Sequence, residues 1–93
     1  MTPNSEYTLV VFYSKTNQQS LNARIVVNEF MIDYFGSVDL TVTEMEYESE
    51  KSKAVEYGVM GTPAIVMLRN GHLIKRHLGE ITASELRTMV RKL

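Results

Sequence analysis

The sequence of 93 residues contains no cysteine. Without a thiol the chain can form no disulfide, no thiolate nucleophile and no sulfur-ligated metal site. The formal net charge of −1 creates no field that would gather nucleic acid or an anionic membrane. No apolar run reaches the roughly 18 residues that a membrane span requires. These absences exclude thiol chemistry and argue against nucleic acid and membranes as partners.

Histidine is scarce, with only His72 and His77 present. In a strand, their spacing places the two side chains on opposite faces, so a chelating pair is not expected. We therefore predict no metal and no cofactor. The first residues, MTPNSEY, lack the basic and apolar regions of a signal peptide, and the cytoplasm is the expected location.

The apolar share of 44% is that of an ordinary globular protein. A chain of this length supplies one small core. We expect residues 1–6 to be an N-terminal lead-in and residues 7–93 to form a single domain.

The hydrophobic pattern predicts the element order β-α-β-α-β-β-α. A βαβ unit followed by a hairpin implies an α/β protein whose four-stranded mixed sheet has helices on both faces. We expect the spatial strand order 2-1-3-4, with the first strand central, the last an antiparallel edge, and the first and third helices on one face. The expected strands are 7–13, 39–47, 64–68 and 72–78, and the expected helices are 18–35, 49–58 and 82–92.

Residues that favour helix ends and tight turns stand at these boundaries. Asn17 and Ser49 are candidate N-caps, because a side-chain oxygen can accept from a free backbone N–H one turn into the helix. The other boundary residues are Gly36 and Gly58 as helix stops, Asn70-Gly71 as a hairpin turn, and Thr82 with Glu85 as a capping box.

The same pattern predicts a core. In helix 18–35 the apolar stripe is expected to run through Leu21, Ile25, Ile32 and Phe35, and Val26, Val27 and Phe30 are expected to widen it. Strand 39–47 carries glutamates on one face, which suits an edge because like charges discourage pairing with another chain; these are Glu44, Glu46 and, just beyond, Glu48. The residues expected to be largely buried are Leu9, Val11, Ile25, Ile32, Val42, Ile65, Met67, Leu86 and Val90.

Several sequence features follow one another in residues 57–90, which read YGVMGTPAIVMLRNGHLIKRHLGEITASELRTMV. They are a glycine at a helix end, a Gly-x-Pro turn, an apolar strand, an Asn-Gly hairpin and a glycine before a capped helix. In this order the segment resembles the second half of a thioredoxin. Strand 7–13 and helix 18–35 correspond to the family's active-site strand and helix. The resemblance implies a thioredoxin-like domain of glutaredoxin length, without the βα unit that precedes the active-site strand in full-length thioredoxins.

The resemblance also indicates where a redox site would stand. Asn17, Gln18, Gln19 and Ser20 occupy the positions of the family's Cys-Gly-Pro-Cys motif, and Val11 replaces a buried aspartate that assists proton transfer. Disulfide exchange requires a thiolate, and a serine hydroxyl without a neighbouring base does not replace it. We therefore expect a redox-inactive member of the family that is not an enzyme.

In the family, the residue at Pro63 is a cis-proline, and the backbone before it holds extended partner segments. The resemblance therefore implies a groove that binds a protein or an extended peptide, with the N–H and C=O of Thr62 pairing as in an added strand. The alternative is that these residues only shape turns and that Asn17 only caps its helix. The expected groove residues are Tyr13, Thr16, Asn17, Met60, Gly61, Thr62, Pro63 and Gly79.

Two other functions remain open. Glutathione transferases stabilise the thiolate of glutathione with a hydroxyl, so Ser14, Thr16 or Ser20 would serve in a glutathione-binding or transferase-like enzyme. Against this, 93 residues leave no second helical domain for a co-substrate. Alternatively, the chain is a structural subunit of a larger complex with its contacts elsewhere, such as strand 72–78. We expect a monomer or a weak homodimer through an edge strand.

Overall fold

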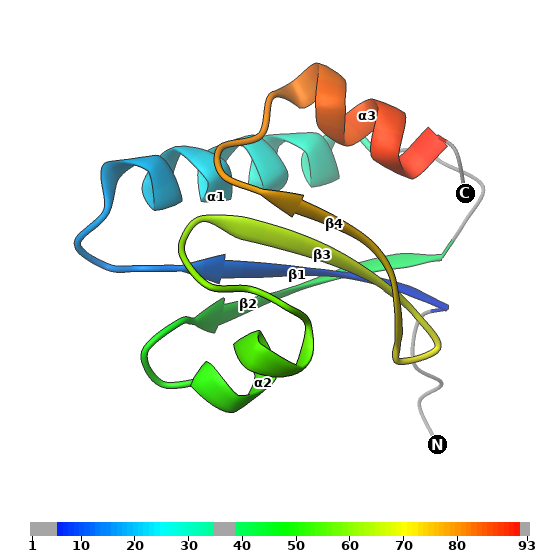
Figure 1. Cartoon of the computed structure of the whole chain (residues 1–93). Coiled ribbons are helices and arrows are strands. Elements are labelled where there is room, and N and C mark those ends of the chain that lie inside the picture. Colours follow the sequence, from blue (N-terminus) through cyan, green and yellow to red (C-terminus); the bar gives the residue numbers. More distant parts are fainter. Residues whose placement is uncertain (1–5, 35–38, 92–93) are drawn as a thin grey trace.

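The structure is a computed structural model that describes residues 6–34 and 39–91. The expected order of elements is confirmed. Helices α1 and α3 lie on one side of the sheet and α2 on the other (Figure 1). The elements are β1 (Tyr7–Tyr13), α1 (Gln18–Ile32), β2 (Leu40–Glu46), α2 (Lys51–Glu56), β3 (Ala64–Arg69), β4 (His72–Leu78) and α3 (Ala83–Arg91).

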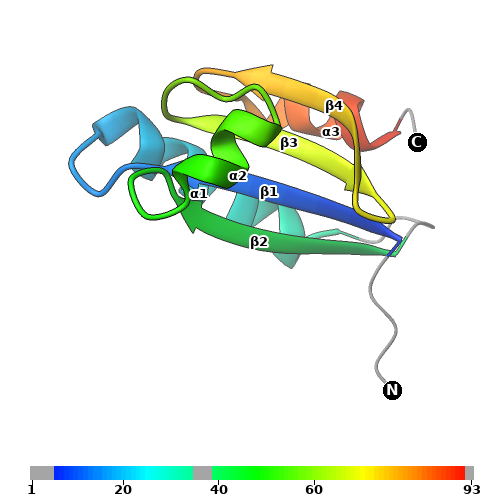
Figure 2. The same cartoon turned by 60° about the horizontal axis from the view of Figure 1, so that its bottom comes forward.

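The sheet has four strands in the order β2-β1-β3-β4, as expected. Strand β1 runs parallel to β2 and antiparallel to β3, and β3 and β4 form an antiparallel hairpin. Figure 2 shows β2 and β4 as the two edges, with α2 crossing one face. Asn70 and Gly71 take φ angles of 51° and 86° in the hairpin turn, which is the left-handed geometry that this dipeptide favours.

Two apolar layers cover the central strands, because successive side chains of β1 and β3 point to opposite faces. One layer lies under α1 and α3 and includes Leu9, Val11, Ile65, Met67, Leu86 and Val90, which are buried as expected. The other lies under α2 and includes Val10, Phe12, Ala54, Tyr57, Val59 and Val66. None of the helices in residues 6–34 and 39–91 is long and apolar enough to cross a membrane.

The buried face of α1 differs from the expectation. Leu21 and Ile25 are each 48% exposed and Ile32 is 77% exposed, and Phe35 lies outside the described residues. Val27, expected to widen the apolar face, is buried, and it is buried together with Ser20 and Ala23. Apolar side chains surround much of this helix, so their spacing does not select one face. The small side chains of Ser20 and Ala23 allow the helix to approach the sheet closely, and they decide which face packs.

Three further expectations were wrong. Val42 is only half-buried, because β2 is an edge strand. Helix α1 ends at Ile32 rather than at residue 35, and Gly36 lies outside the described residues. Ser49 does not cap α2: Glu50 is the N-cap without a side-chain hydrogen bond, and the Ser49 hydroxyl instead donates to Glu46 at 2.6 Å.

The remaining boundary residues behave as expected. Gly58 follows the C-cap of α2 with a φ of 71°, and its N–H donates to the carbonyl of Val55 at 3.0 Å. Thr82 and Glu85 form the capping box of α3: the Thr82 N–H donates to the Glu85 carboxylate at 2.9 Å, and the Glu85 N–H donates to the Thr82 hydroxyl at 3.1 Å. The third helix therefore starts where the sequence pattern places it.

Candidate functional site

Predicted site residues lie side by side at one end of the sheet, where β1 ends, β3 begins and β4 ends. Phe12 of β1 pairs with Ala64 of β3, and Ala64 pairs with Leu78 of β4. One residue further, the Gly79 N–H donates to the Pro63 carbonyl at 2.9 Å. Since adjacent strands lie about 4.8 Å apart, Tyr13, Pro63 and Gly79 form a row across the end of the sheet.

The elbow between β1 and α1 begins directly after this row. Asn17 has an extended backbone, and its side-chain Oδ1 accepts from the Ser20 N–H at 2.9 Å. Its carbonyl accepts from the Leu21 N–H at 3.2 Å. The capping interpretation of Asn17 is thus confirmed, and its side-chain oxygen is already engaged.

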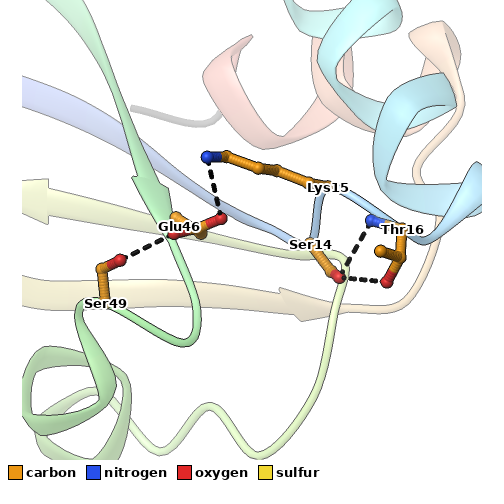
Figure 3. Close-up of polar contacts among 5 residues, drawn as sticks. All are labelled: Ser14, Lys15, Thr16, Glu46 and Ser49. Carbon is orange, nitrogen blue, oxygen red and sulfur yellow. Dashed lines mark hydrogen bonds and ion pairs between the residues drawn. The ribbon is translucent and has the colours of Figure 1, made fainter.

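Hydroxyl groups fill the rest of the elbow. Ser20 is fully buried, and its Oγ accepts from the Ser14 N–H at 3.0 Å. The hydroxyls of Ser14 and Thr16 lie 3.2 Å apart, and the Thr16 N–H donates to the Ser14 hydroxyl at 3.3 Å (Figure 3). Within residues 6–34 and 39–91 none of these three hydroxyls is hydrogen-bonded to an imidazole or a carboxylate. The elbow holds no activated nucleophile.

A polar cluster that sequence reasoning missed lies beside the elbow. The carboxylate of Glu46 accepts from the Ser49 hydroxyl at 2.6 Å and lies 3.5 Å from the Lys15 ammonium (Figure 3). The Ser49 hydrogen bond, and beyond it the charge of Lys15, lowers the pKa of Glu46 below its usual value. A carboxylate with a lowered pKa is a weaker base, so this cluster joins the elbow to β2 rather than activating Ser49.

A second ion pair ties α1 to the same edge strand. The Arg24 guanidinium donates to both carboxylate oxygens of Glu44, at 2.8 and 3.2 Å, and lies 4.2 Å from the centre of the Tyr13 ring. Glu44 and Glu46 are therefore paired with cations, which weakens the like-charge repulsion that the sequence pattern predicted for this face of β2. The alternating glutamates were the available signal, but the sequence does not show which cations reach them.

The loop before β3 supplies the other predicted site residues. The Thr62–Pro63 peptide bond is cis. Pro63 is buried and Thr62 is half-buried, while Met60 is 87% exposed. Among the described residues, Thr62 makes no hydrogen bond. Apart from its chain neighbours, no residue has an atom within 4 Å of the position that a β-carbon would take at Gly61. The space beside the backbone of Gly61 is therefore open.

The structure thus gathers some of the predicted residues and leaves others apart. Tyr13, Pro63 and Gly79 share the row at the sheet end, and Thr16 and Asn17 continue from Tyr13 into the elbow. Met60 and Gly61 contact none of them through a hydrogen bond. We call the whole predicted set the Pro63 surface; it comprises Tyr13, Thr16, Asn17, Met60, Gly61, Thr62, Pro63 and Gly79.

Comparison with known proteins identifies the family. The family model described as Thioredoxin matches residues 2–92, and the chain belongs to the thioredoxin family. It is a member without cysteine, so the positions Asn17, Gln18, Gln19 and Ser20 carry no redox motif. No curated protein matches the chain in sequence.

Solved structures share the fold at low sequence identity. A mutant thioredoxin from Halobacterium salinarum NRC-1 has a TM-score of 0.84 at 19% identity, over 95% of this chain and 74% of that one. Thioredoxin-2, described as a component of malaria parasite protein secretion machinery, has a TM-score of 0.85 at 15% identity, over 99% and 87%. A malarial protein has a TM-score of 0.79 at 17% identity, over 96% and 97%. These likenesses show the fold alone.

Proposed function

We propose that this chain is a redox-inactive thioredoxin-like protein that binds an extended segment of a partner protein at the Pro63 surface. The family supplies the fold, and the composition removes the thiolate on which disulfide exchange depends. Three features remain at the carboxyl end of β1. They are the N-terminus of α1 capped by Asn17, the elbow with its serine and threonine hydroxyls, and the adjacent loop before β3.

One observation carries the proposal. Thr62 is half-buried, yet its N–H and C=O pair with no group of the described residues. An extended partner segment that lies beside Thr62 would pair with both of these groups, in the manner of an added strand. The exposed side chain of Met60, two residues earlier, would then contact the partner's side chains, for which flexible methionine is well suited.

A glutathione-binding enzyme is the weaker candidate. Ser20 is buried and its hydroxyl accepts from Ser14, which leaves only Ser14 and Thr16 for such a role. Their hydroxyls are hydrogen-bonded to each other. The binding proposal expects no affinity for glutathione, and saturable glutathione binding in a calorimetric titration would favour the enzyme instead.

Site-specific photo-crosslinking tests the proposal. A photoreactive amino acid replaces Met60, which is 87% exposed, and in a matched control it replaces Val55 of α2, which is 74% exposed. We expect the Met60 position to capture a defined partner from extracts of the source cells, and the Val55 position not to capture it. In the same background, Thr62→Pro should abolish capture because it removes the N–H, while circular dichroism verifies the fold. Equal capture with and without Thr62→Pro would contradict the proposal.

A further inference from the structure

Some residues of β4 point their backbone N–H and C=O away from β3, toward the outer edge of the sheet. One hydrogen bond between β3 and β4 identifies these residues. The Gly79 N–H donates to the Pro63 carbonyl, so this pair is of the hydrogen-bonded kind. In an antiparallel ladder hydrogen-bonded and non-hydrogen-bonded pairs alternate. His77, opposite Ile65, therefore points its backbone groups inward to β3, whereas Leu78 and Arg76 point theirs outward. Among the described residues, no strand lies beyond β4 in the sheet.

The side chains at these outward positions are exposed on the α2 face. Arg76 Nη1 donates to the carbonyl of Tyr57, at the end of α2, at 3.1 Å. Leu78, two residues on, shares this face and is 55% exposed, and Ile74, on the other side of Arg76, is 42% exposed. The register passes from Lys75 opposite Met67 to Leu73 opposite Leu68, which makes Ile74 the extra residue of a bulge. An exposed arginine thus lies two residues from the exposed Leu78 and two residues from the exposed bulge residue Ile74.

Charge distinguishes this edge from β2. Glu44 and Glu46 of β2 are each paired with a cation, whereas Arg76 has no carboxylate partner among the described residues. On the opposite face of β4, Lys75 donates to the Met89 carbonyl and His77 is hydrogen-bonded to the Glu80 carbonyl, both at 2.8 Å. The edge is therefore basic: among the described residues Lys75 and Arg76 both bond to carbonyls and neither to a carboxylate, and Arg76 is the cation on the α2 face.

We propose that β4 is a second binding site, which takes an extended acidic segment of another protein as a fifth strand. The segment would carry a glutamate or aspartate opposite Arg76 and an apolar side chain two residues away on each side, one against Leu78 and the other next to the bulge at Ile74. Backbone pairing would supply affinity and the carboxylate would supply selection. A second copy of β4 is disfavoured as the partner, because antiparallel self-pairing brings like charges together across the strands.

The site differs from the Pro63 surface in its chemistry. The Pro63 surface offers backbone groups of the loop before β3, whereas β4 offers the outward backbone groups of an edge strand beside an arginine. The location of the affected amides in a spectrum therefore tells the two sites apart, and failure at one does not imply failure at the other.

A peptide titration of the full chain tests the proposal. The probe is the acetylated and amidated peptide Thr-Val-Thr-Glu-Thr-Val-Thr, and the matched control has lysine in place of the glutamate. With the ¹⁵N-labelled protein, we expect saturating probe to slow amide hydrogen exchange of Arg76 and Leu78 about tenfold or more. The inward amide of His77 should not change, because it already bonds to β3.

Two variants test the role of charge. Arg76→Glu should weaken probe binding about tenfold or more, whereas Arg87→Glu, the same reversal on an exposed residue of α3, should leave it unchanged. The spectrum of each variant reports whether it is folded, and the comparison of the two peptides on the unaltered protein does not depend on any variant. Equal binding of both peptides, protection at Thr62 instead of Arg76, or no effect on any amide at millimolar probe would overturn the proposal.

Discussion

The Oγ of Ser20 accepts a hydrogen bond from the backbone N–H of Ser14 at 3.0 Å. This bond connects the first turn of α1 to the residue that follows β1, and Ser20 is completely buried. The resemblance to thioredoxins aligns Ser20 with the last position of the family's redox motif. A position that carries sulfur chemistry in the motif here fixes the shape of the elbow.

Ser20→Ala should therefore destabilise the fold. The substitution leaves the part-buried N–H of Ser14 without its acceptor, and we expect the free energy of unfolding to fall by about 1–3 kcal/mol in urea denaturation. Ser49→Ala is the control, because Ser49 is exposed and water can replace its hydrogen bond; a loss within about 0.5 kcal/mol is expected. Equal losses for the two variants would contradict the structural role of Ser20.

The revised packing of α1 predicts unequal costs for three isoleucines. Ile65 is fully buried between β1 and β4, so Ile65→Ala should cost about 2–5 kcal/mol of unfolding free energy. Ile32, at 77% exposure, should cost about 0.5 kcal/mol or less when replaced by alanine, and half-exposed Ile25 should fall between. Denaturant titrations measure the order. An Ile32→Ala loss as large as that of Ile65→Ala would mean that the helix packs through the other stripe.

The capping box makes stability depend on acid pH. The Thr82 N–H, then its hydroxyl and the charge of His77, lower the pKa of Glu85 below its ordinary value of 4.5. A lowered folded-state pKa contributes stability above the ordinary value, and this contribution is lost as the pH falls through the folded pKa. Glu85→Gln removes the titrating group. The difference in unfolding free energy between the parent and Glu85→Gln should therefore shrink from about pH 6 to about pH 3; a constant difference would show that Glu85 is not stabilised as a carboxylate.

Restoring the motif should restore its chemistry. The double variant Asn17→Cys, Ser20→Cys places one thiol at the N-cap, where the start of a helix lowers a thiol pKa, and a second thiol in the buried position. We expect it to reduce insulin disulfides in a turbidity assay, whereas the parent chain shows no reduction above the reagent blank. The single variant Asn17→Cys lacks a resolving thiol and should not turn over. An inactive, folded double variant would mean that the motif is aligned to the wrong residues.

Much of the fold could be predicted because the conformations that short sequence motifs favour are the same ones that the packed sheet requires. Asn70-Gly71 fixed the hairpin through the positive φ angles that only a few residues accept, and Thr82 with Glu85 fixed the start of α3. The continuous apolar run of β1 indicated a central strand. In each case the short-range chemistry permits one conformation, and the sheet needs that same conformation.

The wrong predictions concern residues whose packing or hydrogen bonding depends on residues that are distant in the sequence. The buried face of α1 depends on how closely Ser20 and Ala23 let the helix approach the sheet, which the apolar spacing does not show. Ser49 can cap a helix, but the carboxylate of Glu46 engages its hydroxyl. For the candidate site, the sequence indicated Asn17 as a cap, whereas the role of Ser20 and the pairing of Lys15 with Glu46 emerge only when β1, α1 and β2 meet.

The most direct measurement of the central claim is amide hydrogen exchange at Thr62 in the purified complex with the partner captured through Met60. The account predicts that the Thr62 N–H, which has no acceptor among the described residues, exchanges at least about tenfold more slowly when the partner is bound. Thr62 exchange that is unchanged in the saturated complex would contradict it, because the partner would then be held without the backbone of the Pro63 surface.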